Sequence, residues 1–162
     1  MALYRTDKRL ERIKDVTFKL EHEIQKLVEE NLSILLGLEF IKSEFAVKNY
    51  RFDTLAFDNE ANSFVIIEYK RDKSFSVIDQ GYAYLEVMLH NKADFILEYN
   101  ERKSKNLKRT DVDWTQSKVI FVSPSFTAYQ REAINFRDLP FELWEIKRFE
   151  NSILSFEQVK RS

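Results

Sequence analysis

The sequence has no cysteine, only two glycines and two prolines, no excess of charge and no long apolar run. The absence of cysteine excludes disulfides, thiolate metal sites and a cysteine nucleophile. Two glycines are too few for the phosphate-binding turns of P-loop or dinucleotide-binding proteins, so no nucleotide cofactor is expected. No apolar stretch reaches the roughly 18 residues of a membrane span. A cytoplasmic location without a membrane partner is therefore expected.

The chain does contain enough apolar material for a core of ordinary size. Hydrophobic residues make up 44% of its 162 residues and aromatic residues 14%, which is typical of a folded domain. One domain over residues 1–162 is expected. Lys and Arg number 26 against 27 Asp and Glu. A nucleic-acid surface would therefore have to be a local patch, because net charge does not indicate one.

Hydrophobic periodicity predicts an α/β fold in which helices flank a mixed sheet. Helices are predicted over 16–36, 77–90 and 126–136, and strands over 39–47, 50–57, 63–70, 94–99, 119–122 and 141–147, with a candidate edge strand over 153–156. The polar segment 101–113 is predicted to be a loop. Gly37 is expected to end the first helix and Ser76 to cap the second.

The centre of the predicted sheet carries two charged residues. Residues 64–67 are apolar at every position, which is typical of a central strand, and they run directly into Glu68-Tyr69-Lys70. Side chains alternate along a strand, so Glu68 and Lys70 share the face occupied by Phe64 and Ile66. The simpler alternative is a strand end that reaches solvent with an ordinary ion pair.

Asp53 interrupts an aromatic and apolar segment in the preceding predicted strand, where Asp is unfavourable. A turn centred between residues 60 and 61 would place Phe57 opposite Phe64 and Asp53 opposite Glu68. The two carboxylates would then lie roughly 5 Å apart, a separation that suits an intervening Mg²⁺ or Mn²⁺. A shifted turn would change this register.

Two predicted helices add further polar residues. Glu21 falls inside the apolar sector of the first helical wheel, whereas Glu29 points elsewhere. Glu21 is therefore either a core-facing carboxylate that needs a partner or one at the edge of the stripe that reaches water. Gln80 and Tyr84 lie one turn apart on one face of the second helix. Gly81 costs about 1 kcal/mol relative to Ala inside a helix, which indicates close approach to the sheet or to a phosphate.

Glu21, Asp53, the Glu68-x-Lys70 triplet and Gln80-x-x-x-Tyr84, in this order on these elements, resemble the PD-(D/E)xK nuclease superfamily. The arrangement is similar to the catalytic domain of NucS-type endonucleases. It is also similar to a family of uncharacterised proteins with related domains, sometimes loosely labelled as predicted transport proteins. The resemblance covers roughly residues 18–149 and implies a restriction-endonuclease-like fold with an αβββαβ core.

The resemblance further implies a metal-dependent nuclease that hydrolyses phosphodiester bonds in DNA. Asp53, Glu68 and the main-chain carbonyl of Tyr69 would ligate Mg²⁺ or Mn²⁺. Lys70 would orient or activate the attacking water. Dimers are common in this superfamily, so a homodimer is one arrangement that the resemblance implies.

The same resemblance assigns supporting roles to the helix residues. Glu21 would hold a metal-bound water or a second ion, and Gln80 and Tyr84 would position Lys70 or the phosphate. Without it, Gln80 and Tyr84 are equally compatible with a polar residue at a helix start and a tyrosine at the core edge. A catalytically silent module that binds nucleic acid or a partner protein is the alternative function. A role in transport finds no support in a chain without a membrane span.

Basic residues near the strand ends and in the predicted loop are the candidates for a nucleic-acid surface. They are Arg51, Arg71, Lys73, Arg102, Lys103, Lys105, Lys108 and Arg109. Residues 101–109 contain five basic residues and one acidic residue, and such a run either follows a phosphate backbone or is a solvated loop.

Overall fold

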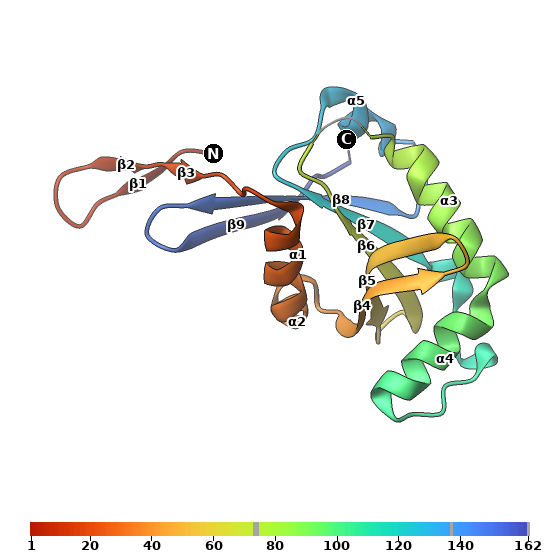
Figure 1. The fold of residues 1–162 in the computed structure, drawn as a ribbon. Coiled ribbons are helices and arrows are strands. Elements are labelled where there is room, and N and C mark those ends of the chain that lie inside the picture. Colours follow the sequence, from red (N-terminus) through yellow and green to blue (C-terminus); the bar gives the residue numbers. More distant parts are fainter. Residues whose placement is uncertain (73–74, 137, 162) are drawn as a thin grey trace.

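The computed structural model describes residues 1–72, 75–136 and 138–161, and its centre is a seven-stranded mixed sheet with helices on both faces (Figure 1). The helices are α1 (Glu21–Glu30), α2 (Leu32–Leu36), α3 (Val77–His90), α4 (Lys92–Lys103) and α5 (Ala128–Ala133), with short 3₁₀ turns η1 (Arg109–Asp111) and η2 (Trp114–Gln116). The sheet contains β3 (Asp15–Val16), β4 (Glu39–Val47), β5 (Tyr50–Asp58), β6 (Ser63–Tyr69), β7 (Lys118–Ser123), β8 (Phe141–Phe149) and β9 (Ile153–Gln158).

The sheet joins an antiparallel half to a parallel half. Strands β4, β5 and β6 are antiparallel neighbours, whereas β6, β7 and β8 run parallel. Apart from α2 and α4, the order α1, β4-β5-β6, α3, β7 follows the αβββαβ core that the resemblance implied, with β7 in place of the strand predicted over 94–99. This restriction-endonuclease-like arrangement confirms the expected fold class.

Each face of the sheet has its own helical layer and apolar core. Ile24 of α1 belongs to the same buried cluster as Ile67 of β6, on one face. Met88 of α3 and Phe95 of α4 share a cluster with Ile66 on the other. Every residue of β6 is buried, as the apolar run predicted for a central strand.

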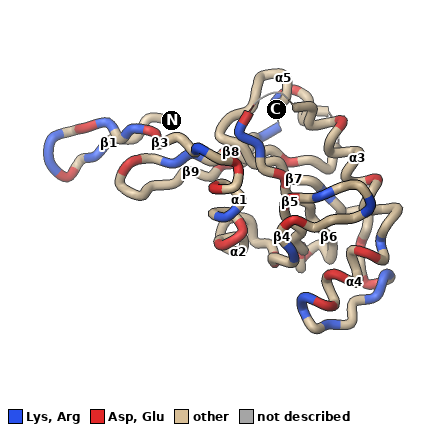
Figure 2. Tube along the Cα trace, viewed as in Figure 1, with Lys and Arg blue, Asp and Glu red and all other residues tan. Residues whose placement is uncertain are grey.

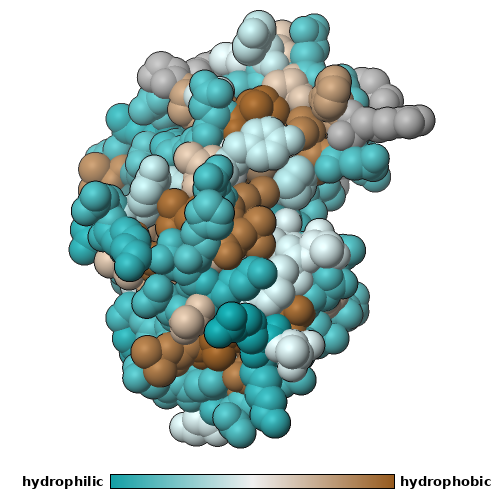
Figure 3. All heavy atoms as spheres, turned by 90° about the vertical axis from the view of Figure 1, so that its right-hand side faces the viewer, coloured by the Kyte–Doolittle hydropathy of each residue, from teal (hydrophilic) through white to brown (hydrophobic). Residues whose placement is uncertain are grey.

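Helices α3 and α4 cover one side of the molecule (Figures 1 and 3). On this side, apolar side chains lie in separate patches within a largely hydrophilic surface. Gly81 allows α3 to approach the sheet, since a Cβ there would lie only 2.5 Å from Cε1 of Phe141 in β8. The close approach predicted for Gly81 is therefore to a core aromatic ring.

Three predicted boundaries are corrected by the structure. The strand predicted over 94–99 is wrong, because these residues lie in α4, where the buried Phe95 and Tyr99 are four positions apart. A short apolar run fits a buried strand and a buried helix equally well. The predicted 101–113 loop consequently begins after Lys103 and contains η1. The helix predicted over 126–136 is shorter, spanning only α5.

The first helix also differs from its prediction. It begins at Glu21, because Val16 belongs to β3, and it is divided at Asn31. The Asn31 side-chain amide donates to the Leu27 carbonyl at 2.8 Å, which competes with continuation of the backbone helix. Gly37 ends α2 in a left-handed conformation at φ 66°, as predicted. The Ser76 side chain caps α3, as predicted, by accepting from the Asp79 amide.

The β5–β6 hairpin has the predicted register. Phe57 pairs with Phe64, and the ladder continues to Thr54 opposite Ile67. The next positions in this register are Asp53 and Glu68. The candidate site therefore begins where the regular ladder ends.

An arm at the N-terminus was not predicted. Strands β1 (Leu3–Arg5) and β2 (Glu11–Ile13) form a separate two-stranded sheet, which projects away from the central sheet together with the β8–β9 hairpin (Figure 1). Residues 1–14 carry five basic and two acidic residues, and Lys and Arg gather along this arm (Figure 2). Among the described residues, no helix is long and apolar enough to cross a membrane.

Candidate active site

Asp53 and Glu68 are linked by two hydrogen bonds from backbone amides to carboxylate oxygens, at the position where the β5–β6 backbone pairing ends. The Asp53 amide donates to Oε1 of Glu68 at 2.9 Å, and the Tyr69 amide donates to Oδ2 of Asp53 at 3.0 Å. Each carboxylate thus binds the backbone of the neighbouring strand through one oxygen. The second oxygens, Oδ1 of Asp53 and Oε2 of Glu68, take no part in these bonds.

Burial raises the pKa of both carboxyl groups. Burial, followed by the charge of Asp53, raises the pKa of Glu68 to about 8. Burial also raises the pKa of Asp53 against the opposing hydrogen bond from the Tyr69 amide, and the charge of Glu44 adds to the rise. Ionising both carboxylates at neutral pH is therefore unfavourable unless a cation compensates them.

Lys70 supplies part of that compensation from the same strand end. Its amide donates to the Val122 carbonyl at 2.8 Å, which extends the parallel pairing of β6 with β7. Its ammonium nitrogen lies 5.3 Å from the centroid of the Phe75 ring. The charge of Lys70 lowers the pKa of both Asp53 and Glu68, so it acts directly on the carboxylate pair.

Gln80 and Tyr84 of α3 contact each other beside this pair. Nε2 of Gln80 donates to the Tyr84 hydroxyl at 3.0 Å. Burial, then the charges of Glu68 and Asp53, raise the pKa of Tyr84, so its hydroxyl stays protonated next to the carboxylates. Oε1 of Gln80 is buried without a hydrogen-bond partner among the described residues. Such an atom costs about 1–3 kcal/mol and is a natural contact for a ligand or water.

Of the two positions predicted for Glu21, facing the core or at the edge of the apolar stripe, the structure shows the second. It is the first residue of α1 and is exposed. Its Oε1 accepts from the Arg71 amide at 3.2 Å, which ties the start of α1 to the chain just beyond Lys70. The charge of Glu21 contributes to the raised pKa of Asp53, so Glu21 lies within electrostatic reach of the site.

The side-chain amide of Gln25 in α1 contacts the backbone of Asp53, and the sequence did not indicate this residue. Gln25 is only 5% exposed. Its Nε2 lies 3.0 Å from the Asp53 carbonyl oxygen, 3.1 Å from Oγ of Ser43 and 3.3 Å from Oε1 of Glu44. Glu44 itself has a left-handed backbone, at φ 54°. Gln25 thereby fixes the backbone of Asp53 against α1.

Glu29 also faces the sheet, so the prediction that it points elsewhere is wrong. The Thr54 hydroxyl donates to Oε2 of Glu29 at 2.5 Å and lies 2.9 Å from the Tyr69 hydroxyl. Glu29 lies one turn after Gln25 at the edge of the apolar sector of α1, and its long side chain reaches Thr54 of β5 from there. The available signal was a polar pair four residues apart and Thr54 within an apolar strand.

Two of the predicted basic residues lie near the site. The exposed Arg71 guanidinium donates to the carbonyl oxygens of Phe18 and Lys19. Nε of Arg51 lies 3.4 Å from Oε2 of Glu44. Lys73 lies outside the described residues.

The other predicted basic residues lie far from the carboxylates. Arg102 and Lys103 are helical rather than in a loop, and they pair with Glu98 at 3.6 Å and Glu39 at 3.5 Å. The exposed Lys105, Lys108 and Arg109 follow α4. The Asp113 amide just beyond them donates to the Asn62 carbonyl, immediately before β6 begins. Glu68 is at the other end of this strand, roughly 20 Å away at 3.3 Å per residue, so this basic run does not adjoin the site.

The donor set of the site suits a hard divalent cation. In the described part of the chain, no group of three or more His, Asp or Glu side chains is placed to hold a metal ion. Asp53 and Glu68 nevertheless offer two adjacent carboxylates next to the main-chain carbonyl of Tyr69. Mg²⁺ keeps several waters and commonly binds only one or two protein carboxylates. The residues present therefore fit such an ion.

No family model matches the sequence. A Haemophilus influenzae protein described only as an uncharacterized protein is 58% identical over 153 residues. The match covers 94% of this chain and 51% of the relative. The chain therefore spans about half the length of this curated relative.

Two solved structures are similar over about half of their own length. The EndoMS–dsDNA2 complex is 20% identical with a TM-score of 0.45, covering 84% of this chain and 50% of that one. A repair endonuclease from Pyrococcus abyssi is 22% identical with a TM-score of 0.43, covering 82% and 50%.

Proposed function

We propose that the chain is a metal-dependent nuclease that hydrolyses phosphodiester bonds in DNA, with Asp53, Glu68 and Lys70 at its active site. One observation carries this proposal: the buried Glu68 and the half-buried Asp53 each accept a hydrogen bond, at 2.9 Å and 3.0 Å, from a backbone amide of the other's strand, with the Lys70 ammonium group at the same strand end. Two adjacent carboxylates that burial withdraws from water are unfavourable by themselves. The ordered resemblance to the PD-(D/E)xK superfamily supports a phosphodiester substrate.

The carboxylates and the Tyr69 carbonyl would hold Mg²⁺ or Mn²⁺. When bound, the ion would polarise the scissile phosphate and offset the charge that develops there. Lys70 would orient the attacking water from the face that it shares with Glu68. Its position over the Phe75 ring limits where its ammonium group can lie.

The helix residues would act around this centre. Tyr84 keeps its proton and can donate it in a hydrogen bond to a phosphate oxygen or a water. Gln80 is held by Tyr84 and has a buried carbonyl oxygen still to be satisfied. Glu21, at the rim, would hold a metal-bound water or a second ion.

The test is cleavage of single-stranded, duplex, branched and mismatched DNA by the purified protein with Mg²⁺ or Mn²⁺. Lys70→Ala should lower the rate by about 10²- to 10⁴-fold, the usual contribution of a group that handles a proton. Lys108→Ala, at the other end of β6, is the matched control and should cleave normally. Absence of cleavage on every substrate would refute the catalytic proposal.

Metal binding is tested separately from cleavage. Mn²⁺ should raise the melting temperature of the wild-type protein, because an ion that binds only the folded state stabilises it. The increase should disappear in Asp53→Asn. Equal stabilisation of both proteins would place the metal elsewhere.

A further inference from the structure

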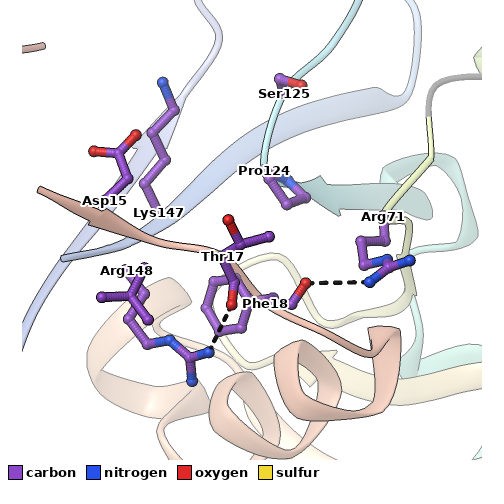
Figure 4. Close-up of a pocket in the computed structure, with 9 residues that line it drawn as sticks. Asp15, Thr17, Phe18, Arg71, Pro124, Ser125, Lys147 and Arg148 are labelled. Carbon is purple, nitrogen blue, oxygen red and sulfur yellow. Dashed lines mark hydrogen bonds between the residues drawn. The ribbon is translucent and has the colours of Figure 1, made fainter.

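A pocket of about 530 Å³ opens beside the carboxylate site, just beyond the ends of β6 and β7. Its walls come from four segments: β3 with the two residues after it, Arg71 beyond β6, Pro124 and Ser125 beyond β7, and Lys147 and Arg148 of β8. Figure 4 shows Lys147 and Arg71 on opposite sides of this space, with Thr17 and Phe18 between them.

The register of the strands explains why this space exists. β9 occupies one edge of β8, where it pairs with residues 144–149. On the opposite edge, β7 pairs with residues 141–145 of β8 and β3 pairs with residues 148–149. β7 ends before β3 begins, which leaves a gap along that edge. The pocket occupies this gap.

The pocket is positively charged. Arg71, Lys147 and Arg148 line it against a single carboxylate, Asp15. The two arginines are fixed by the protein: Arg71 donates to the Phe18 carbonyl, and Arg148 lies 4.4 Å from the centroid of the Phe18 ring. Arg148 also pairs with Glu23, outside the pocket lining, at 3.4 Å.

Lys147 differs from the two arginines. It is half-buried, yet among the described residues its ammonium group forms no ion pair or hydrogen bond. Nε of Arg148, next in sequence, is likewise buried without a partner in the part of the chain that the structure describes. The remaining Arg148 nitrogens already donate to Glu23 and to the Thr17 carbonyl. The pocket thus offers one unsatisfied ammonium donor, Lys147, on a frame fixed by the two arginines, and a charged donor of this kind suits a phosphate group.

We propose that this pocket binds a backbone phosphate of the nucleic-acid strand on which the carboxylate site acts. The inference rests on the proposed function, and it adds Lys147 as a binding residue that the sequence did not indicate. The strand would pass from the site to the pocket past Arg71, which immediately follows Lys70. Beyond the pocket, β3 leads into the basic arm of residues 1–14 (Figure 2).

The spacing is compatible with one continuous strand. Tyr69, Val122 and Trp144 lie level across β6, β7 and β8, and Lys147 is three residues further along. Three residues of rise and two strand spacings place Lys147 roughly 14 Å from Tyr69. That distance corresponds to about four phosphates at 3.4 Å of duplex axis each.

The test measures binding of fluorescein-labelled single-stranded and duplex DNA by anisotropy in EDTA, across a series of salt concentrations. Lys147→Gln should weaken binding to all sequences alike and reduce the slope of log K against log salt by about 0.7 to 0.9, one phosphate contact. Lys147→Glu should cause a larger loss. Lys108→Gln removes the same charge at the other end of β6 and should leave the slope unchanged.

Unchanged slopes in both Lys147 variants, or an equal reduction in Lys108→Gln, would overturn the proposal. Tighter binding of inorganic phosphate alone than of the labelled DNA, measured by competition, would also overturn it. The binding and cleavage measurements test the two proposals separately. A protein that never cleaves but depends on Lys147 for binding refutes the proposed function alone, whereas a cleaving protein indifferent to Lys147 refutes the pocket alone.

Discussion

The two ends of β6 carry charged residues in contrasting arrangements. At the end marked by Tyr69, Glu68 is buried with Asp53, and Lys147 has no ion-pair or hydrogen-bonding partner within the described residues. At the Ser63 end, the basic residues mix with acidic ones: residues 98–113 hold five basic and four acidic side chains, and two of the basic ones form ion pairs. Unbalanced buried charge makes the first end the candidate functional site, whereas the charges of the second are those of a solvated surface.

The largest expected difference between the ends is in the pH dependence of stability. The raised pKa of Glu68, about 8, means that the folded state binds more protons than the unfolded state between about pH 4.5 and 8. The free energy of unfolding should therefore fall with rising pH in this window, by a few kcal/mol at about 1.4 kcal/mol per unit. Urea unfolding without divalent ions at a series of pH values measures this slope.

Glu68→Gln is the matched variant for that experiment. It should reduce the slope and leave the protein more stable than wild type at pH 8. Adding Mn²⁺ should restore wild-type stability at high pH and have little effect on the variant. A wild-type stability that is constant or rises over this window would show that the carboxylate pair is already compensated.

Substitution of the two glycines should have an effect of intermediate size on stability. It also compares the two ends, because only Gly81 lies in the helix that carries Gln80 and Tyr84. Gly81→Ala places a Cβ within 2.5 Å of the Phe141 ring and should destabilise by about 1–3 kcal/mol through overpacking. It should also weaken Mn²⁺ binding, because α3 carries Gln80 and Tyr84. Gly37→Ala meets no atom within 4 Å, so only its left-handed backbone costs free energy, about 1 kcal/mol.

Chemical unfolding and Mn²⁺ titration of these two glycine variants provide the comparison. Gly37 ends α2 just before β4, whose first residue pairs with Phe57, far from the carboxylates. Its variant should therefore bind Mn²⁺ as the wild type does. Equal losses of metal affinity in both variants would mean that global stability, and not the placement of α3, sets the affinity.

The smallest effect is expected at the Ser63 end. Lys103→Gln breaks an ion pair with Glu39 in which both side chains are about one-quarter exposed. It should cost less than about 1 kcal/mol and leave DNA affinity unchanged in the anisotropy assay. A clear loss of DNA affinity would move the nucleic-acid surface to this end and remove the contrast.

Much of the site could be predicted because its signals are local. The alternation that places Glu68 and Lys70 on one face, and the register that brings Asp53 opposite Glu68, follow from a short hairpin in which few registers are available. The error at 94–99 has the same origin. A local pattern of apolar residues does not say whether Phe95 and Tyr99 are buried by a strand or by a helix.

The sequence alone determined the elements and the chemistry of their ends: a central strand that ends in Glu68 and Lys70, a preceding strand with a misplaced Asp53, and a capped helix with Gln80 and Tyr84. Only the tertiary structure decided which distant segments meet them. It placed Gln25 beneath Asp53, moved the 102–109 basic run to the far end of β6, and opened a cationic pocket between β7 and β3. Periodicity is a property of neighbouring residues, whereas these contacts join residues 28 to more than 130 positions apart, which only the packing of the whole chain fixes.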